Sequence, residues 1–262
     1  MEEASGASWP GVLDEPAPPL AATAFTGMVH RRLMGEPVQY VVGHWAFRHL
    51  DLLVNPSVLI PRPETEVVVE VALAELDGLP GPRPRAVDLG TGSGAIALSL
   101  AYERADVEVW AVDRSPAALS VASANLAGLG TLAVGRAHMA LGDWWQALPP
   151  ELAGRVDLMV SNPPYVAEAE LATLPREVVC WEPRAALAGG PDGLGPLAAI
   201  MDGAPHWMAP RSTAVVEIAP DQAVAALEIC WEAGFSDADV RNDLAGRPRV
   251  LVAHRRGPAG RR

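Results

Sequence analysis

The sequence predicts an α/β fold in which a mostly parallel sheet is covered by helices. Short apolar segments typical of strands occur at 86–89, 107–112, 156–160 and 213–218, and helical segments lie between them at about 95–104, 115–127 and 196–209. Strands that alternate with helices of this length require right-handed crossovers, and these build a parallel sheet. A final helix at 221–233 and short strands near 235–240 and 249–253 complete the expected domain.

The segment ahead of this sheet divides into a leader and a small appendage. Residues 1–24 hold four prolines among Ala, Gly and acidic residues, a composition that buries too little apolar surface to fold, so we expect a disordered leader. In 25–78 we expect a short helix, which starts at Ala24 and ends before Gly35, then a β-hairpin over 40–54 and a helix capped by Thr65.

The main domain is expected over 85–254, after a linker at 78–84 that is rich in Gly and Pro. Residues 255–262 carry four arginines interrupted by Gly and Pro. We expect this end of the chain to be a solvated basic tail.

Charge and hydropathy exclude several classes of protein. A formal net charge of −12 argues against a protein that binds mainly by covering phosphates, so no direct binding of nucleic acid is expected. No apolar run approaches the roughly 20 residues that a membrane span needs, and the start Met1-Glu2-Glu3 lacks the cationic region of a secretory signal. We therefore expect a cytoplasmic protein without a membrane partner.

No metal site is expected. Cys180 and Cys230 lie fifty residues apart with no CxxC or HExxH spacing around them, and the six histidines are scattered along the chain. Structural and catalytic zinc sites use closely spaced ligands, which this pattern does not offer.

A glycine-rich loop follows the first strand of the main domain: Gly90, Thr91, Gly92, Ser93 and Gly94. Such a loop lets a ligand approach bare backbone, and the N–H groups at the start of the next helix attract anions. Nineteen residues after Gly94, the second strand ends in Asp113, where a carboxylate can accept both hydroxyls of an adenosine ribose. Together these features predict an adenosine-containing cofactor, although a nicotinamide or flavin site would show a similar loop.

A second loop, Asn162-Pro163-Pro164-Tyr165, follows the strand at 156–160. Because ligands bind at the carboxyl ends of parallel strands, we expect it to share a crevice with the glycine loop. Two prolines remove two N–H donors and stiffen the backbone, so acceptors at Asn162 and Pro163 can hold a planar NH2 group, against which Tyr165 can stack. This composition favours methyl transfer to an amide or amino nitrogen, with a plain structural loop as the alternative.

The Asn-Pro-Pro-Tyr loop resembles the signature of the amino-methyltransferases, and the wider chain is similar to the peptide chain release factor glutamine N5-methyltransferase family. The matching segments are Gly35-Glu36-Pro37 with Tyr40, Leu-Ile-Pro-Arg-Pro-Glu-Thr-Glu at 59–66, the glycine loop, Glu182-Pro183 with Ala186-Leu187, Asp192-Gly193-Leu194, and Asp243-Leu244-Ala245-Gly246 with Arg249. They cover residues 35 to 253.

The resemblance implies a Rossmann-like, seven-stranded class I methyltransferase sheet with a short N-terminal appendage, S-adenosylmethionine as cofactor, and methyl transfer to the glutamine amide in the Gly-Gly-Gln loop of a release factor. It also assigns roles to particular residues. The cofactor would contact Gly90, Thr91, Gly92, Ser93, Gly94, Asp113, Asp143, Trp144 and Asn162, while Asn162, Pro163, Pro164 and Tyr165 would bind the substrate, with catalysis carried by Asn162, Pro163 and Tyr165. Trp144 and its neighbour Trp145 are equally explained as core or interface residues.

Some features depart from that family or leave alternatives open. Only 34 residues precede Gly35, fewer than the family usually carries, and 217–219 reads Glu-Ile-Ala in place of Glu-Ile-Gly. Residues 217–219 are far from the chemistry in sequence, and we expect them to modify loops only. Glu64 and Glu66 are interpreted as first-turn acids that favour the helix dipole. The alternatives are transfer to an amino group of a nucleic acid base or small molecule, and a cofactor-binding protein without turnover.

Overall fold

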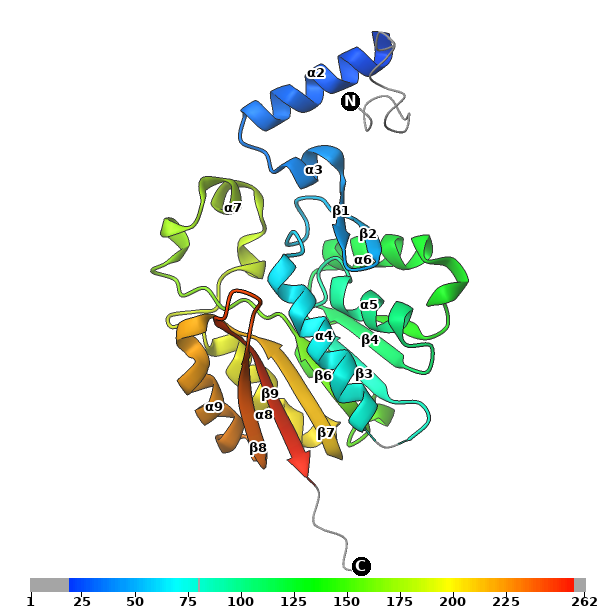
Figure 1. The fold of residues 1–262 in the computed structure, drawn as a ribbon, viewed down its shortest axis with the longest axis vertical. Helices are drawn as coiled ribbons and strands as arrows, with labels where there is room; N and C mark the ends of the chain where they lie inside the picture. The colour runs from blue at the N-terminus through cyan, green and yellow to red at the C-terminus, as the bar shows by residue number, and fades with distance from the viewer. Residues whose placement is uncertain (1–18, 80, 257–262) are drawn as a thin grey trace, which may run out of the picture.

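The computed structural model describes residues 19–79 and 81–256. Its main body is a seven-stranded sheet of order β5-β4-β3-β6-β7-β9-β8, in which β5, β4, β3, β6 and β7 run parallel and β9 and β8 are antiparallel to their neighbours (Figure 1). The strands are β3 (Arg85–Leu89), β4 (Glu108–Asp113), β5 (Ala137–Leu141), β6 (Val156–Ser161), β7 (Met208–Glu217), β8 (Asp237–Asn242) and β9 (Pro248–Arg256). The expected mostly parallel α/β sheet is confirmed.

Strand β5 had no counterpart among the segments picked out from hydropathy. It lies at the edge of the described sheet, pairs with β4, and is mostly half-buried. An edge strand of this kind needs no continuous apolar run, so its residues, which include His138 and Ala140, give little local signal.

Helices cover both faces of the sheet, because alternate strand residues point to opposite sides. Ala86 packs into one apolar cluster with α4 and α5, and Val87 packs into another with α8 and α9. The helices of the main body are α4 (Pro63–Gly78), α5 (Ala95–Glu103), α6 (Pro116–Gly128), the short α7 (Arg176–Trp181), α8 (Gly195–Trp207) and α9 (Ala223–Glu232).

The N-terminal appendage comprises α2 (Pro19–Leu33), α3 (Val38–Val42) and a hairpin of β1 (His44–Phe47) and β2 (Leu50–Leu53). The expected helix start at Ala24 was wrong, since residues 19–24 belong to α2. Pro19 suits a first helical position, where its missing N–H costs nothing, and the hydroxyl of Thr23 donates to the Pro19 carbonyl over 2.9 Å. The remainder of the expected leader, residues 1–18, lies outside the described residues.

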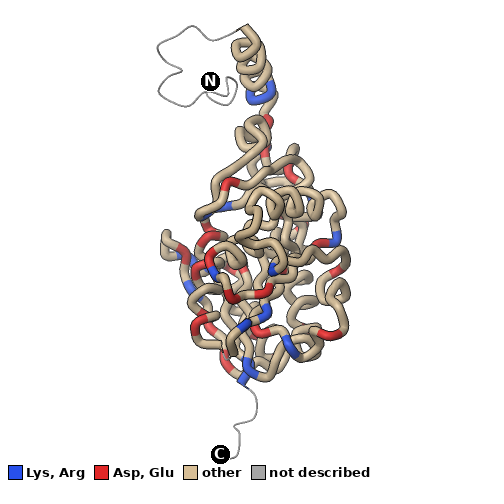
Figure 2. The backbone as a smooth tube through the Cα atoms, turned by 90° about the vertical axis from the view of Figure 1, so that its right-hand side faces the viewer, with Lys and Arg blue, Asp and Glu red and all other residues tan. Residues whose placement is uncertain are grey.

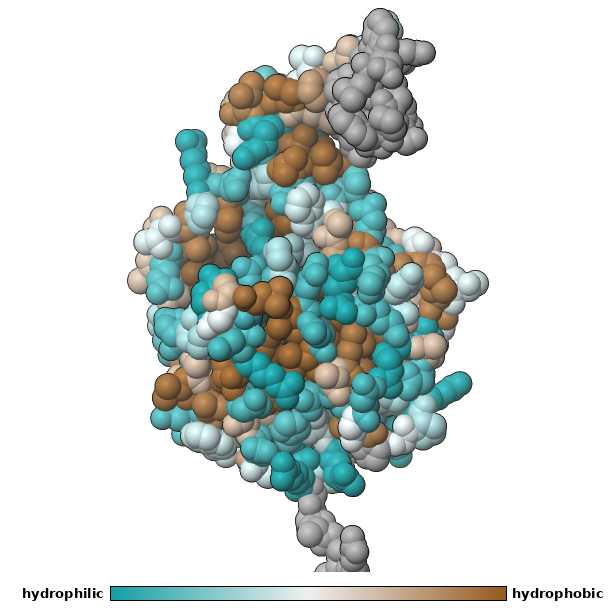
Figure 3. Space-filling view, viewed as in Figure 1, coloured by the Kyte–Doolittle hydropathy of each residue, from teal (hydrophilic) through white to brown (hydrophobic). Residues whose placement is uncertain are grey.

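Helix α2 stands apart from the main body (Figure 1), and apolar side chains are gathered over it in Figure 3. The hairpin is shorter than the expected 40–54, because 38–42 form α3, which ends at Gly43 with φ +89°. That left-handed conformation is one that glycine adopts without strain.

Two further expectations were wrong. Thr65 does not cap α4, which begins at Pro63; its buried side chain points instead toward β7. Arg255 and Arg256 are not part of a free tail, because β9 runs to Arg256. The Arg255 guanidinium donates to the Met208 carbonyl over 2.7 Å, which anchors it to β7, and residues 257–262 lie outside the described part.

Candidate cofactor and amide-binding site

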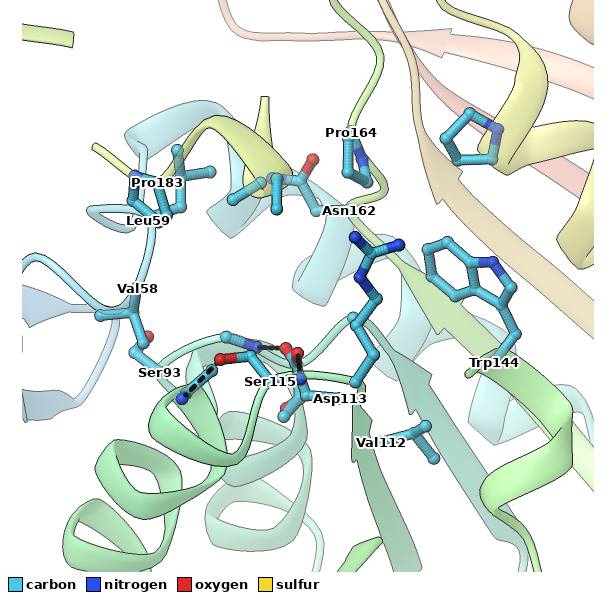
Figure 4. Close-up of a pocket in the computed structure, with 18 of the residues that line it drawn as sticks. Val58, Leu59, Ser93, Val112, Asp113, Ser115, Trp144, Asn162, Pro164 and Pro183 are labelled. Atoms are coloured by element: carbon cyan, nitrogen blue, oxygen red, sulfur yellow. Dashed lines mark hydrogen bonds between the residues drawn. The ribbon is translucent and has the colours of Figure 1, made fainter. Parts of the chain in front are cut away.

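A cavity of about 720 Å³ lies at the carboxyl ends of β3, β4 and β6 (Figure 4). Its size suits a cofactor of a few hundred daltons. Nine of the predicted site residues line it: Gly90, Thr91, Gly92, Ser93, Asp113, Asp143, Trp144, Asn162 and Pro164. The two predicted loops therefore do share one crevice, as the rule for parallel strands requires.

The glycine loop owes its shape to left-handed backbone. Gly90, Gly92 and Gly94 have φ values of +83°, +56° and +86°, which side chains rarely tolerate. A Cβ at Gly92 would meet nothing within 4 Å, whereas a Cβ at Gly94 would lie 2.9 Å from Leu98 Cδ1. Gly92 therefore leaves open space, whereas Gly94 lies against Leu98 of α5 and does not itself line the cavity.

Asp113 anchors the glycine loop from the end of β4. Its Oδ2 accepts a hydrogen bond from the Gly92 N–H over 2.9 Å and its Oδ1 accepts one from the Ser115 N–H over 2.8 Å (Figure 4). A carboxylate has about four acceptor positions, so two remain for hydroxyl groups in the cavity. This geometry fits the predicted contact with a ribose.

Asp88, which sequence reasoning did not single out, supports the same loop from beneath. It is fully buried in β3, and its Oδ2 accepts from the Thr91 hydroxyl over 2.6 Å and from the Ala97 N–H over 3.1 Å. Its Oδ1 has no hydrogen-bond partner among the residues that the structure describes. Burial raises the pKa of Asp88 to about 7 against the opposing effect of these bonds. A charged residue inside an apolar strand was the signal that could have revealed it.

Trp144 forms one side wall of the cavity (Figure 4). It has a φ of +45°, and a Cβ at Gly90 would lie 3.4 Å from its ring. Trp145 points the other way: it is buried, and its indole N–H donates to the Ile200 carbonyl over 2.7 Å. The core interpretation therefore holds for Trp145, while Trp144 and Asp143 line the cavity.

The Asn-Pro-Pro-Tyr loop lies across the cavity from Asp113 (Figure 4). The Asn162 Nδ2 donates to the Thr65 hydroxyl oxygen over 3.1 Å. Asn162 and Pro164 line the cavity, but Pro163 is buried and Tyr165, which is half-buried, does not line it. The Tyr165 hydroxyl donates to Glu217 over 3.2 Å, so direct contacts of Pro163 and Tyr165 with a substrate remain predictions.

Glu217 is the residue that sequence reasoning misplaced. It ends β7 and is buried behind the Asn-Pro-Pro-Tyr loop, where it accepts hydrogen bonds from Thr65 over 2.6 Å and from Tyr165. Residues 217–219 are far from that loop in sequence, but the expectation that they modify loops only was wrong, because β7 pairs with β6, the strand that leads into the loop. Burial raises the pKa of Glu217, although the Thr65 hydrogen bond and the positive charge of Arg249 oppose that change.

Two other segments that carried the resemblance meet at the cavity rim. Glu182 is buried, accepts a hydrogen bond from the Ile60 N–H over 3.1 Å and forms an ion pair with Arg62. Their neighbours Leu59, Pro61 and Pro183 line the cavity. The 59–66 segment and the Glu182-Pro183 pair, 120 residues apart in sequence, thus form one wall.

Glu64 and Glu66 do not contribute to that wall. Glu66 accepts a hydrogen bond from the Arg48 N–H over 3.0 Å, and Glu64 pairs with Arg247 at 3.3 Å. Both contacts join elements of the scaffold, in keeping with the structural role expected for them.

Comparison with known proteins agrees with this geometry. Residues 70–188 match the family model for the methyltransferase small domain. The chain is 43% identical over 245 residues to a release factor glutamine methyltransferase from Moorella thermoacetica, covering 93% of this chain and 84% of that protein. It is also 43% identical over 236 residues to the release factor glutamine methyltransferase from Bordetella pertussis, covering 90% of this chain and 84% of that protein.

Solved structures share the fold at lower identity. The hMettl16 catalytic domain has a TM-score of 0.61 at 14% identity and covers 81% of this chain and 77% of its own. A methyltransferase from Pyrococcus furiosus has a TM-score of 0.54 at 14% identity, and the match covers 88% of this chain and 100% of that one. These likenesses show the class I methyltransferase fold, and the sequence identities over most of the chain show that it belongs to the release factor glutamine methyltransferase family.

Proposed function

We propose that this chain transfers a methyl group from S-adenosylmethionine to the side-chain amide nitrogen of a glutamine in the Gly-Gly-Gln loop of a peptide chain release factor. One observation carries the proposal: the glycine loop and Asn162 line a single cavity. A cofactor held by the first would place its reactive group beside the second. The family to which the chain belongs points to the same reaction.

The residues of the cavity fit this cofactor. Asp113 retains acceptor positions for ribose hydroxyls, Trp144 offers a flat face for adenine, and Gly92 leaves its backbone open. Asp143 lines the same part of the cavity and is suited to accept from the adenine amino group. S-adenosylmethionine supplies the methyl group as an electrophile, and the protein provides the position of the nitrogen that receives it.

Asn162 would hold that nitrogen. An amide nitrogen is a weak nucleophile because its lone pair is delocalised into the carbonyl. The Asn162 Nδ2 is committed to Thr65, so its Oδ1 is the end available to accept from a substrate NH2 group. This contact aims the nitrogen and strengthens as positive charge develops on it. Pro164 would lie against the amide, with the Pro163 carbonyl as a further acceptor.

The proposed partner is a protein, the release factor, and the proposed location is the cytoplasm. Within residues 19–79 and 81–256, no helix is both long enough and apolar enough to span a bilayer. Along the tube in Figure 2, acidic and basic positions are interspersed over the described body, which suits contact with a folded protein better than the covering of a phosphate backbone.

The test is mass spectrometry of a release factor incubated with this protein and S-adenosylmethionine. We expect one added methyl group on the glutamine of the Gly-Gly-Gln loop, and none on a release factor in which that glutamine is replaced by alanine. If the protein binds S-adenosylmethionine but leaves the release factor unmodified, the proposed substrate is wrong. Methylation of RNA or free glutamine in its place would favour the broader amino-methyltransferase alternative.

A further inference from the structure

A buried series of hydrogen bonds connects Asn162 to the end of β7. The Asn162 Nδ2 donates to Thr65 Oγ1 over 3.1 Å, and the Thr65 hydroxyl donates to Glu217 Oε2 over 2.6 Å. Thr65 and Glu217 are only 4% and 1% exposed, so water does not compete for these groups. The series joins three elements: the first turn of α4, the loop after β6 and the end of β7.

The number of available hydrogens determines which group donates and which accepts at each step of this series. A threonine hydroxyl has one hydrogen to donate, and that hydrogen is used by Glu217. Its oxygen can then only accept from Asn162, so the NH2 end of the Asn162 amide must face Thr65. The Oδ1 end is left for the cavity, where it has no hydrogen bond to the described protein.

We infer that Glu217 is a positioning residue that acts through Thr65 to hold the Asn162 amide with its oxygen toward the cavity. The inference rests on the proposed function, because it explains how Asn162 presents an acceptor to a substrate NH2 group. With the opposite orientation Asn162 would present its own NH2 group, and two sets of donors would face each other. A hydrogen bond would be replaced by a repulsive contact.

The second oxygen of Glu217 serves the same loop. Its Oε1 accepts from the Tyr165 hydroxyl over 3.2 Å, and Tyr165 lies three residues after Asn162. One carboxylate thus holds both ends of the Asn-Pro-Pro-Tyr loop from behind. The two prolines between these ends restrict the backbone, so fixing both ends fixes the loop.

Three variants test the inference. Glu217→Gln keeps the shape but can donate to Thr65, which frees the Thr65 hydrogen and allows the Asn162 amide to turn over. Thr65→Val keeps the volume and removes the hydroxyl. Each should lower kcat about 10- to 100-fold, the size of one lost hydrogen bond to a charged group. The double variant should be little worse than the worse single one, because both act on the same series.

Rescue and control variants separate positioning from folding. Thr65→Ser restores the hydroxyl and should recover most of the rate. Thr213→Val removes the hydroxyl of a second buried threonine, which lies in β7 and outside the cavity, and should leave kcat near that of the parent. The dissociation constant for S-adenosylmethionine and the melting temperature, measured for every variant, should change little if the role is positioning.

A second measurement reports the amide orientation without any substrate. In the parent protein with selectively ¹⁵N-labelled asparagine, the Asn162 NH2 protons should show a nuclear Overhauser effect to the Thr65 methyl group, and Glu217→Gln should weaken it. An unchanged effect in Glu217→Gln, or a kcat in both single variants within about twofold of the parent, well short of one lost charged hydrogen bond, would overturn the inference. If the parent itself does not methylate the release factor, the proposed function fails, and the amide orientation still decides the role of Glu217.

Discussion

Replacement of Asp113 by alanine tests the cofactor site most directly. The change removes a carboxylate whose two oxygens accept from Gly92 and Ser115 over 2.9 and 2.8 Å. It also removes the acceptor positions that face the cavity. The glycine loop would lose one of its anchors at the same time as the ribose would lose its partner.

The size of the effect follows from these contacts. A hydrogen bond to a charged group contributes about 1.5 to 3 kcal/mol, so loss of the ribose contact alone should weaken the binding of S-adenosylmethionine roughly 10- to 100-fold. Because the Gly92 N–H also loses its acceptor, we expect Asp113→Ala to lie near the upper end of that range. Asp113→Asn keeps one acceptor oxygen and should have a smaller effect.

Isothermal titration calorimetry with S-adenosylmethionine and S-adenosylhomocysteine measures these affinities. Asp77→Ala is a matched control, because the Asp77 side chain is 79% exposed and pairs with Arg104. The affinity of this variant for S-adenosylmethionine should equal that of the parent. An unchanged affinity in Asp113→Ala would remove Asp113 from the site. Tight binding of NAD by the parent, with none of S-adenosylmethionine, would refute the cofactor assignment as a whole.

Three further predictions concern the substrate, the buried acid and the cavity wall. Asn162→Ala should lower the single-turnover rate of methyl transfer about 100- to 1000-fold at saturating cofactor, which is the usual cost of losing one preorganised hydrogen-bond partner of the transition state. A rate within about tenfold of the parent, well short of that loss, would contradict the proposed mechanism. Burial raises the pKa of Asp88 to about 7, so the folded state keeps a proton that the unfolded chain loses near pH 4. The contribution of this proton to the free energy of unfolding is complete below about pH 4 and is lost as the pH rises through about 7. Between pH 5 and pH 8 the free energy of unfolding should therefore fall by about 2 to 3 kcal/mol more in the parent than in Asp88→Asn, as urea unfolding would show; equal falls would count against the raised pKa. Arg62→Met leaves the buried carboxylate of Glu182 without its ion-pair partner. Since Arg62 is itself about one-third exposed, we expect the free energy of unfolding in urea to fall by about 2 to 3 kcal/mol. A fall below about 0.5 kcal/mol would show that the pair is already well solvated.

Local pattern in the sequence was sufficient for the parallel sheet, for the glycine loop and for the shared crevice. Strands β3 and β6 are almost wholly buried and, apart from Asp88 and Asp157, read as short apolar runs. Features with a weak local signal were missed or misplaced. The half-buried edge strand β5 has little apolar character, and α2 begins at a proline that composition alone assigned to the leader.

The contacts that complete the site depended on tertiary structure. Thr65 and Glu217 are 152 residues apart in sequence, and Arg62 and Glu182 are 120 apart. Each pair meets only because β7 lies beside β6 in the sheet and because the segment after β6 returns to α4. The sequence by itself determined which residue types stand at the ends of the strands, because the alternation of strands and helices is a local property. Only the folded chain decided which buried carboxylate faces which hydroxyl, because strand order brings together residues that no local pattern relates.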